Sequence, residues 1–297
     1  MADPGWHSHP AARAWRCTPA RAALTSAFHA GLPGYAATPL VELPGLAAEL
    51  GVGRVFVKDE SSRLGLPAFK ALGASWAIAQ ILADRAQLTG PLTMGALRTA
   101  AAADPITLVT ATDGNHGRAV ARIAALLGLA AHVFVPQVIF AGAAAAIAAE
   151  GARVTTVSDS YDAAVEQAAA AAADRSDAVL VQDTAWAGYR QVPGWVVEGY
   201  ATLLAETDAQ LAEAGVARLG LIAVPVGVGS LAQAVVTYHR SAASPAPAVL
   251  SVEPDAAACV LRSLLLGALS TITTVPTVMA GLNCGTPSLL AWPVLQA

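Results

Sequence analysis

Residues 58–76 of the chain read Lys58-Asp-Glu-Ser-Ser-Arg-Leu-Gly-Leu-Pro-Ala-Phe-Lys70-Ala-Leu-Gly-Ala-Ser-Trp76. A strand-like run that begins at Arg54 leads into this stretch, a polar loop follows, and a helical pattern begins near Phe69. Lys70 is therefore expected in the first turn of a helix, where the positive end of the helix dipole disfavours a cation. Such a lysine is either solvated and incidental, or an amine of lowered pKa that can form a Schiff base with an aldehyde cofactor. On this stretch alone, the solvated lysine is the simpler interpretation.

Two further loops have the glycine pattern of anion-binding turns. One is Thr110-Ala-Thr-Asp-Gly-Asn-His-Gly-Arg-Ala-Val120, and the other is Val224-Pro-Val-Gly-Val-Gly-Ser-Leu-Ala232. Each joins an apolar run to a helical pattern, so free N–H groups of a helix start would face a ligand that glycine lets come close. Successive N–H groups in such a turn form a phosphate cradle. One glycine turn is weak evidence, but the lysine and both loops together indicate a cofactor site.

Short apolar runs alternate with helical patterns through the middle of the chain. Strands are expected near 106–110, 131–135, 153–157, 178–182, 219–225 and 248–252. Helices are expected near 70–87, 114–128, 142–150, 161–174, 194–214, 229–241 and 256–268. This alternation predicts an α/β fold with parallel sheets flanked by helices. Ligands of such folds bind beyond the carboxyl ends of the strands, where we place all three loops.

The composition excludes several classes of protein. With 297 residues, 55% hydrophobic and 13% charged, the chain can bury a large core in one or two domains. A net charge of −4 gives no basic stripe for nucleic acid. Three cysteines without paired spacing (Cys17, Cys259 and Cys284) indicate neither a disulfide framework nor a zinc site. The uncharged run 219–238 is interrupted by proline and glycine and does not read as a membrane helix, and the polar N-terminus shows no signal peptide. A cytoplasmic protein without nucleic-acid or membrane partners is expected.

Taken together, these motifs resemble those of the pyridoxal-phosphate enzymes of fold type II, the tryptophan synthase β and threonine dehydratase group. Within that group the chain looks most like the diaminopropionate ammonia-lyases. The matching segments are 65–75, 112–117, 182–186, 227–231 and 279–288. The resemblance implies two domains, each with a mostly parallel twisted sheet flanked by helices. The expected large cofactor-binding domain comprises residues 1–75 and 195–297, the small domain residues 76–194, and a homodimer is the expected assembly.

The resemblance also implies a cofactor and a reaction. Lys70 would hold pyridoxal 5′-phosphate through a Schiff base, and Asn115 would hydrogen-bond the ring hydroxyl of the cofactor. The phosphate would lie on the backbone N–H groups of Gly227, Val228, Gly229, Ser230 and Leu231, with the Ser230 hydroxyl as a further donor. The implied reaction is α,β-elimination on a small amino acid, 2,3-diaminopropionate, to pyruvate and ammonia. The lysine, once released from the cofactor, would remove the α-proton.

Two aspartates, Asp113 and Asp183, complete the predicted catalytic set. Asp113 stands where relatives that dehydrate serine or threonine commonly carry a small, uncharged residue. A carboxylate there suits a substrate that enters with a second ammonium. In the resembled family both aspartates serve substrate binding and acid–base chemistry; the counterpart of Asp113 is the base for the D-isomer and the lysine is the base for the L-isomer. From the residues alone, each aspartate could instead cap a helix or a turn.

Three more polar residues have two interpretations each. His116 either takes part in catalysis or supports the site from the core. Glu253 either approaches the cofactor ring or is an ordinary polar strand end. Cys284 is expected to pack near the site rather than act as a nucleophile.

Two alternative functions stay open. One is a serine/threonine dehydratase, which Asp113 disfavours, and the other is a cofactor-binding remnant without activity. The resembled family continues well beyond Ala297, and residues 263–297 carry no charged side chain. We therefore expect a truncated chain that exposes apolar surface, with poor solubility or a compensating interface.

Overall fold

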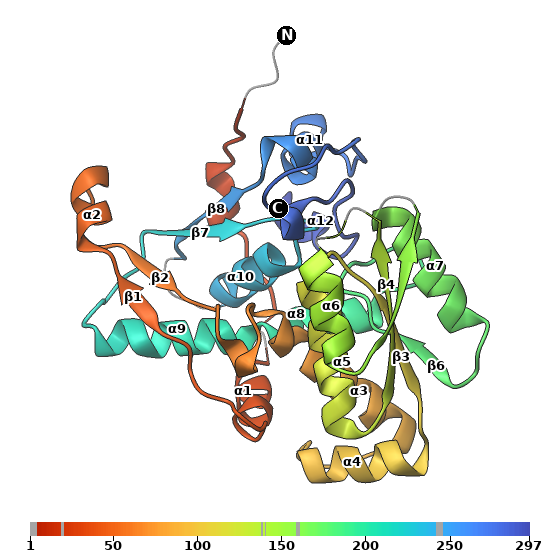
Figure 1. Ribbon diagram of the computed structural model, residues 1–297. Coiled ribbons are helices and arrows are strands. Elements are labelled where there is room, and N and C mark those ends of the chain that lie inside the picture. Colours follow the sequence, from red (N-terminus) through yellow and green to blue (C-terminus); the bar gives the residue numbers. More distant parts are fainter. Residues whose placement is uncertain (1–4, 19–20, 138, 140, 159–160, 242–245) are drawn as a thin grey trace.

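The structure is a computed structural model and describes residues 5–18, 21–137, 139, 141–158, 161–241 and 246–297 (Figure 1). Parallel strands alternate with helices through most of the chain, as the sequence predicts. Every expected strand and every expected helix has a counterpart in the structure, with ends that differ by a few residues. None of the described helices combines the length and the apolar composition that crossing a bilayer requires.

The larger sheet is parallel and has four strands in the spatial order β5-β4-β3-β6. Its strands are β3 (Thr107–Ala111), β4 (Ala130–Pro136), β5 (Arg153–Val157) and β6 (Ala178–Leu180). Helix α7 (Tyr161–Ala173) packs against β3, β4 and β6, while α5 (Asn115–Leu127) packs against β3 and β4 from the other face (Figure 1). Helices on both faces bury the sheet, which explains the nearly continuous apolar runs of β3 and β4.

Two smaller sheets complete the strands. The pair β7 (Leu221–Pro225) and β8 (Ala248–Val252) is parallel, whereas β1 (Leu40–Glu42) and β2 (Phe56–Lys58) are antiparallel. The prediction that all three loops follow parallel strands is therefore wrong for the lysine loop, which follows β2. The chain reverses through the short helix α2 (Pro44–Leu50) between β1 and β2, so these strands pair as a hairpin with an enlarged connection.

The remaining helices surround these sheets. They are α1 (Ala22–Ala30), α3 (Lys70–Ala86), α4 (Met94–Ala103), α6 (Ala141–Ala149), α8 (Gln191–Gly199), α9 (Ala201–Glu213), α10 (Ser230–Arg240), α11 (Cys259–Leu266) and α12 (Trp292–Leu295). Four short 3-10 segments are η1 (Pro10–Ala14), η2 (Arg63–Gly65), η3 (Asp255–Ala257) and η4 (Ala280–Leu282). The single helix expected over 194–214 is divided at Tyr200 into α8 and α9.

Helices α3 and α8 pack closely because glycines face each other where they meet. A Cβ on Gly199 would lie 2.6 Å from the carbonyl oxygen of Leu72 and 2.8 Å from the Cα of Gly73. A Cβ on Gly73 would lie 2.6 Å from the ring of Tyr200. No larger residue fits at either position without moving a helix. This contact sets the position of α3, the helix that begins with Lys70.

A buried charge network holds the loop between β2 and α3. The Arg63 guanidinium is fully buried and forms ion pairs with Glu60 (2.6 Å) and Glu206 (2.7 Å). Glu206 also accepts from Lys58 Nζ at 2.8 Å. Burial alone would raise the pKa of Glu206, but the hydrogen bonds from Arg63, Lys58 and Tyr35 lower it to about 2. The network ties the loop to α9 and so helps to fix the start of α3.

The division into two domains stays a prediction. Its boundaries at 75/76 and 194/195 fall inside α3 and α8, the two helices that pack against each other through glycine. One core cluster of buried side chains also extends from α1 and α3 through β3 and β4 to α10 and α11.

Candidate active site

A cavity of about 560 Å³ opens where three loops meet. Its lining comes from the start of α3, the loop from β3 to α5, the segment after β6, the turn from β7 to α10, and residues 278–282 with Cys284. The predicted site residues among its lining are Lys70, Asp113, Asn115, Asp183, Gly227, Val228, Gly229, Ser230 and Leu231. The fold thus brings together Lys70, the two aspartates of the predicted catalytic set, and the residues predicted to bind the cofactor.

Lys70 is the first residue of α3, as predicted, and its side chain reaches Asp183, with which it forms a short ion pair. The expectation of a lowered lysine pKa is wrong in this structure. Burial lowers the pKa of Lys70, but the charge of Asp183 and the hydrogen bond to it outweigh burial and raise the pKa above its ordinary value. The amine is therefore held as an ammonium until another group takes the place of Asp183.

Asp183 is the buried counter-ion of the cavity, since its side chain is only 7% exposed. Burial raises the pKa of this carboxyl, but Lys70 and His116 lower it to about 2. The imidazole of His116 donates from Nε2 to the carbonyl of Val181 at 2.7 Å, and its Nδ1 lies 3.9 Å from Asp183. Burial lowers the pKa of His116. A neutral imidazole behind Asp183 supports the site from the core, in line with the second interpretation of His116.

Asp113 differs from Asp183 because it has no ion pair or hydrogen bond among the residues that the structure describes. Burial raises its pKa first, the charge of Asp183 adds to this, and the outcome is a pKa of about 7. The capping interpretation does not hold, because the hydroxyl of Thr112 accepts from the N–H groups of Gly114 (2.9 Å) and Gly117 (3.0 Å) at the start of α5. Asp113 is left to face the cavity with a proton that titrates near neutrality.

The turn before α10 has the shape of an anion cradle. Gly229 has φ +98°, and a Cβ there would lie 2.9 Å from Leu295, so glycine is required. Among the described residues, no acceptor meets the N–H groups of Gly227, Val228 or Gly229. These donors stand at the positive end of an eleven-residue helix and suit a phosphate. The Ser230 hydroxyl, expected as a further donor, bonds instead to the carbonyl of Asp183 at 2.8 Å.

Glu253 and Cys284, the two other polar candidates from the sequence, have structural roles. The carboxylate of Glu253 accepts from the N–H groups of Val260 (2.8 Å) and Leu261 (2.7 Å), so it caps α11 and does not line the cavity. Cys284 does line the cavity, is 7% exposed and packs against Gly227. Burial raises the pKa of the Cys284 thiol, which fits a packed residue rather than a nucleophile.

The structure adds Tyr161 to the cavity, which the sequence analysis did not single out. Its hydroxyl accepts from the Gln182 side chain at 2.9 Å. The other end of the Gln182 amide accepts from Thr110 and from the N–H of Ala111, both at 3.0 Å. A tyrosine at the start of an alanine-rich helix has no sequence signal that separates it from a surface residue.

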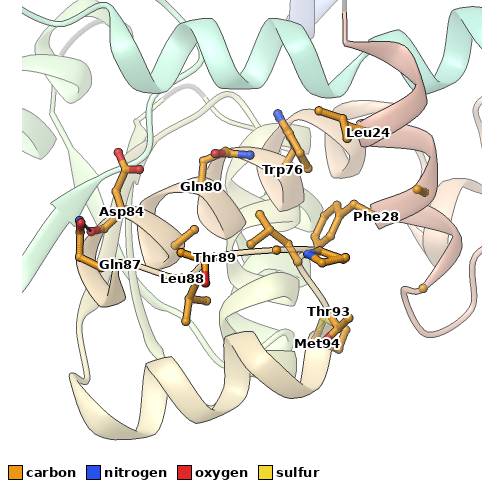
Figure 2. A pocket seen from close by; sticks show the side chains of 16 residues that line it. Leu24, Phe28, Trp76, Gln80, Asp84, Gln87, Leu88, Thr89, Thr93 and Met94 are labelled. Atoms are coloured by element: carbon orange, nitrogen blue, oxygen red, sulfur yellow. Dashed lines mark hydrogen bonds between the residues drawn. The ribbon is translucent and has the colours of Figure 1, made fainter.

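A second cavity of about 650 Å³ lies elsewhere, between α1, the C-terminal half of α3 and residues 88–94 (Figure 2). Figure 2 shows Phe28 and Trp76 at one end and Asp84 with Gln87 at the other. Among the described residues that line it, Asp84 alone carries a charge. The described lining of this cavity contains no lysine, so the cavity at Lys70 is the candidate active site.

Comparison with known proteins agrees with this site. Residues 32–297 match the family of pyridoxal-phosphate dependent enzymes. The chain is 41% identical to the diaminopropionate ammonia-lyase of Salmonella typhimurium (strain LT2) over 278 residues, and 39% identical to that of Escherichia coli (strain K12) over 279 residues. These alignments cover 91% and 93% of this chain and 69% of each relative.

Solved structures of diaminopropionate ammonia lyase are also similar to this chain. The Escherichia coli diaminopropionate ammonia lyase in complex with D-serine superposes with a TM-score of 0.87 at 37% identity, over 95% of this chain and 72% of that one. The same enzyme in complex with an aminoacrylate-PLP azomethine reaction intermediate superposes with a TM-score of 0.83 at 38% identity. That superposition covers 93% of this chain and 68% of the other. A threonine deaminase from T.th. is less similar, with a TM-score of 0.68 at 27% identity over 88% of this chain and 74% of that one.

The fold and the cavity define a pyridoxal-phosphate enzyme of fold type II. Within that class, the chain belongs to the diaminopropionate ammonia-lyase family.

Proposed function

We propose that the chain converts 2,3-diaminopropionate to pyruvate and ammonia by α,β-elimination with pyridoxal 5′-phosphate. The observation that carries this proposal is that the cavity at Lys70 holds two aspartates, Asp113 and Asp183, whose pKa values differ widely. Asp183 has a pKa of about 2 and Asp113 of about 7, so one carboxylate stays charged while the other exchanges a proton near neutral pH. Eliminating an amine requires such a group, because the amine leaves poorly unless it is protonated.

The described residues fit the cofactor. Lys70 lines the cavity, and its amine can form one covalent bond once it has left Asp183. The N–H groups of Gly227, Val228 and Gly229 have no other acceptor among those residues. Asn115 lines the same cavity and can hydrogen-bond the ring hydroxyl of the cofactor. When bound, pyridoxal phosphate supplies the electron sink that stabilises the charge left at Cα after its proton is removed.

The chain's own residues then divide the proton transfers. Lys70 Nζ, once released, takes the α-proton of the L-isomer, and Asp113 takes that of the D-isomer from the opposite side. When Lys70 is the base, Asp113 exchanges its proton with the β-amine, so that the group that leaves is the protonated one and departs as ammonia. Asp183 stays ionised and attracts the second ammonium of the substrate after Lys70 has moved away. A serine has no second ammonium, so it gains less from these carboxylates.

Pyruvate release from diaminopropionate and from serine tests the proposal. The wild type is expected to prefer diaminopropionate, Lys70→Ala to be inactive on both, and Asp113→Ala to lose more activity on diaminopropionate than on serine. Asp84→Asn is the matched control, because it changes a carboxylate in the second cavity only. Equal losses on both substrates in Asp113→Ala would argue for a serine/threonine dehydratase, and Lys70-dependent cofactor binding without pyruvate would argue for a binding remnant.

A cytoplasmic homodimer is the proposed compartment and assembly. Cys17, Cys259 and Cys284 are all free thiols, which suits a reducing compartment. Near the carboxyl end, Val278 is 92% exposed and Val275 57% exposed, and a partner subunit would cover such side chains. A sedimentation experiment distinguishes the dimer from a monomer.

A further inference from the structure

Tyr200 is a fully buried tyrosine beside the reactive lysine, and nothing in the proposed reaction uses it. Its side chain is 0% exposed, and its hydroxyl has no hydrogen-bond partner among the described residues. Leaving a buried hydroxyl without a partner costs free energy, so such groups are rare in folded proteins. A partner that is absent from one state of the protein but present in another would explain why a tyrosine, and not a phenylalanine, lies there.

The packing of α3 places the ring of Tyr200 against Gly73 and Phe69, the neighbours of Lys70 on that helix. The ring of Tyr200 lies directly over Gly73, where a Cβ would come within 2.6 Å of Cε1. Gly73 is three residues after Lys70, so the two positions are neighbours on the same face of α3. The ring of Phe69 closes the other side, with its centroid 5.0 Å from that of Tyr200 and 5.6 Å from Lys70 Nζ. The hydroxyl and the amine also affect each other's pKa, which requires them to be close.

We propose that Tyr200 is a positioning residue for Lys70: when the amine leaves Asp183, Tyr200 Oη accepts a hydrogen bond from Nζ and holds it beside the cavity. The inference rests on the proposed function, since the lysine must leave Asp183 to form and break its bond to the cofactor. Two alternative partners, a carboxylate on one side and a neutral hydroxyl on the other, give the amine two defined positions. The burial that surrounds Tyr200 keeps its pKa above the ordinary value, so the hydroxyl stays neutral in both.

The chain offers an unusually clean test, because Lys58 and Lys70 are its only lysines. The test is made in an Asp183→Asn background, because there the amine has lost the carboxylate that holds it in the wild type. Trace acetylation of this apo protein at alkaline pH, followed by peptide mass analysis, gives the labelling rate of Lys70 relative to Lys58. A hydrogen bond from an ammonium to a buried hydroxyl raises the lysine pKa by about one unit. In Tyr200→Phe this bond is absent, so the ratio of labelling rates should rise about tenfold. Tyr238→Phe is the matched control, since it removes a hydroxyl on α10, outside the cavity lining, and should leave the ratio unchanged.

A ratio in Asp183→Asn/Tyr200→Phe within twofold of that in Asp183→Asn would overturn the proposal and make Tyr200 a core tyrosine. If the double variant does not fold, crystal structures of the wild type with and without cofactor decide instead. An Oη within hydrogen-bond distance of Nζ in either state supports the proposal, and an Oη turned away from the lysine in both states refutes it. Labelling of the apo chain needs no turnover, so pyruvate release from the wild type tests the proposed reaction separately.

Discussion

Replacing Asp113 by asparagine should make the folded protein more stable at neutral pH while it impairs the proposed reaction. The carboxyl has a pKa of about 7 in the folded chain, about 3 units above the ordinary value of an aspartate. Each unit corresponds to about 1.4 kcal/mol, so ionising Asp113 in the folded protein costs up to about 4 kcal/mol. Asparagine has nearly the same shape and does not ionise, and it therefore avoids this cost.

The sign of the pH dependence follows from the raised pKa. The folded wild type binds the proton of Asp113 more tightly than the unfolded chain does, so its stability falls as the pH rises from about 4 to about 7. The stability advantage of Asp113→Asn over the wild type should therefore grow by about 2–3 kcal/mol between pH 5 and pH 8. The other titrating groups are common to both proteins, and those that do not interact with Asp113 cancel in the difference.

Urea unfolding of both apo proteins at pH 5 and pH 8 measures this difference. A stability difference that is the same at both pH values would refute the account of Asp113 as a buried carboxyl that titrates near neutrality. A parallel assay of pyruvate release should show that the more stable variant is the less active one on diaminopropionate.

Three further predictions follow from the packing and the charges. Gly73→Ala should lower the free energy of unfolding by about 1–3 kcal/mol, since its Cβ would lie 2.8 Å from a backbone oxygen of α8, while Gly45→Ala, with nothing within 4 Å, should not. Glu206→Gln should cost about 3–5 kcal/mol at pH 7, because buried Arg63 loses one of its two charged partners and keeps only Glu60. The loss should be smaller at pH 3, where the unfolded wild type gains a proton at Glu206 that the folded protein, with a pKa of about 2 at this group, does not bind; an equal loss at both pH values would contradict this. Gly229→Ala should weaken pyridoxal-phosphate binding in a fluorescence titration, because a side chain strains the turn at φ +98° and displaces its N–H groups. An unchanged affinity would contradict the proposal that this turn binds the phosphate.

The sequence predicted most of the elements and the site loops because both depend on local patterns. Period and propensity located the strands and helices of the middle of the chain, although α1, α2, α4 and β1 were not predicted. The glycines of the 112–117 and 227–231 loops marked the turns that line the cavity. The position of Lys70 at the first residue of α3 followed from the polar loop before it. These signals lie within a few residues of the feature that they predict.

The features that could not be predicted from the sequence depend on contacts between residues that are not neighbours in the chain. Lys70 and Asp183 are 113 residues apart, and only their ion pair shows that the lysine pKa is raised rather than lowered. The ring of Tyr200 packs on α3 because glycines of α3 and α8 face each other, and in the sequence these glycines look like ordinary small residues. The capping role of Glu253 likewise becomes visible only when the N–H of Val260, seven residues after it, is placed at the start of α11.

The central claim, that Lys70 is the residue that holds pyridoxal phosphate, can be tested directly. The purified chain is incubated with the cofactor, reduced with borohydride and mapped by peptide mass analysis, which must distinguish only Lys58 and Lys70. The account predicts a phosphopyridoxyl group on Lys70, no label on Lys58, and loss of the group when diaminopropionate is added before reduction. Label on Lys58, or none on Lys70, would contradict it.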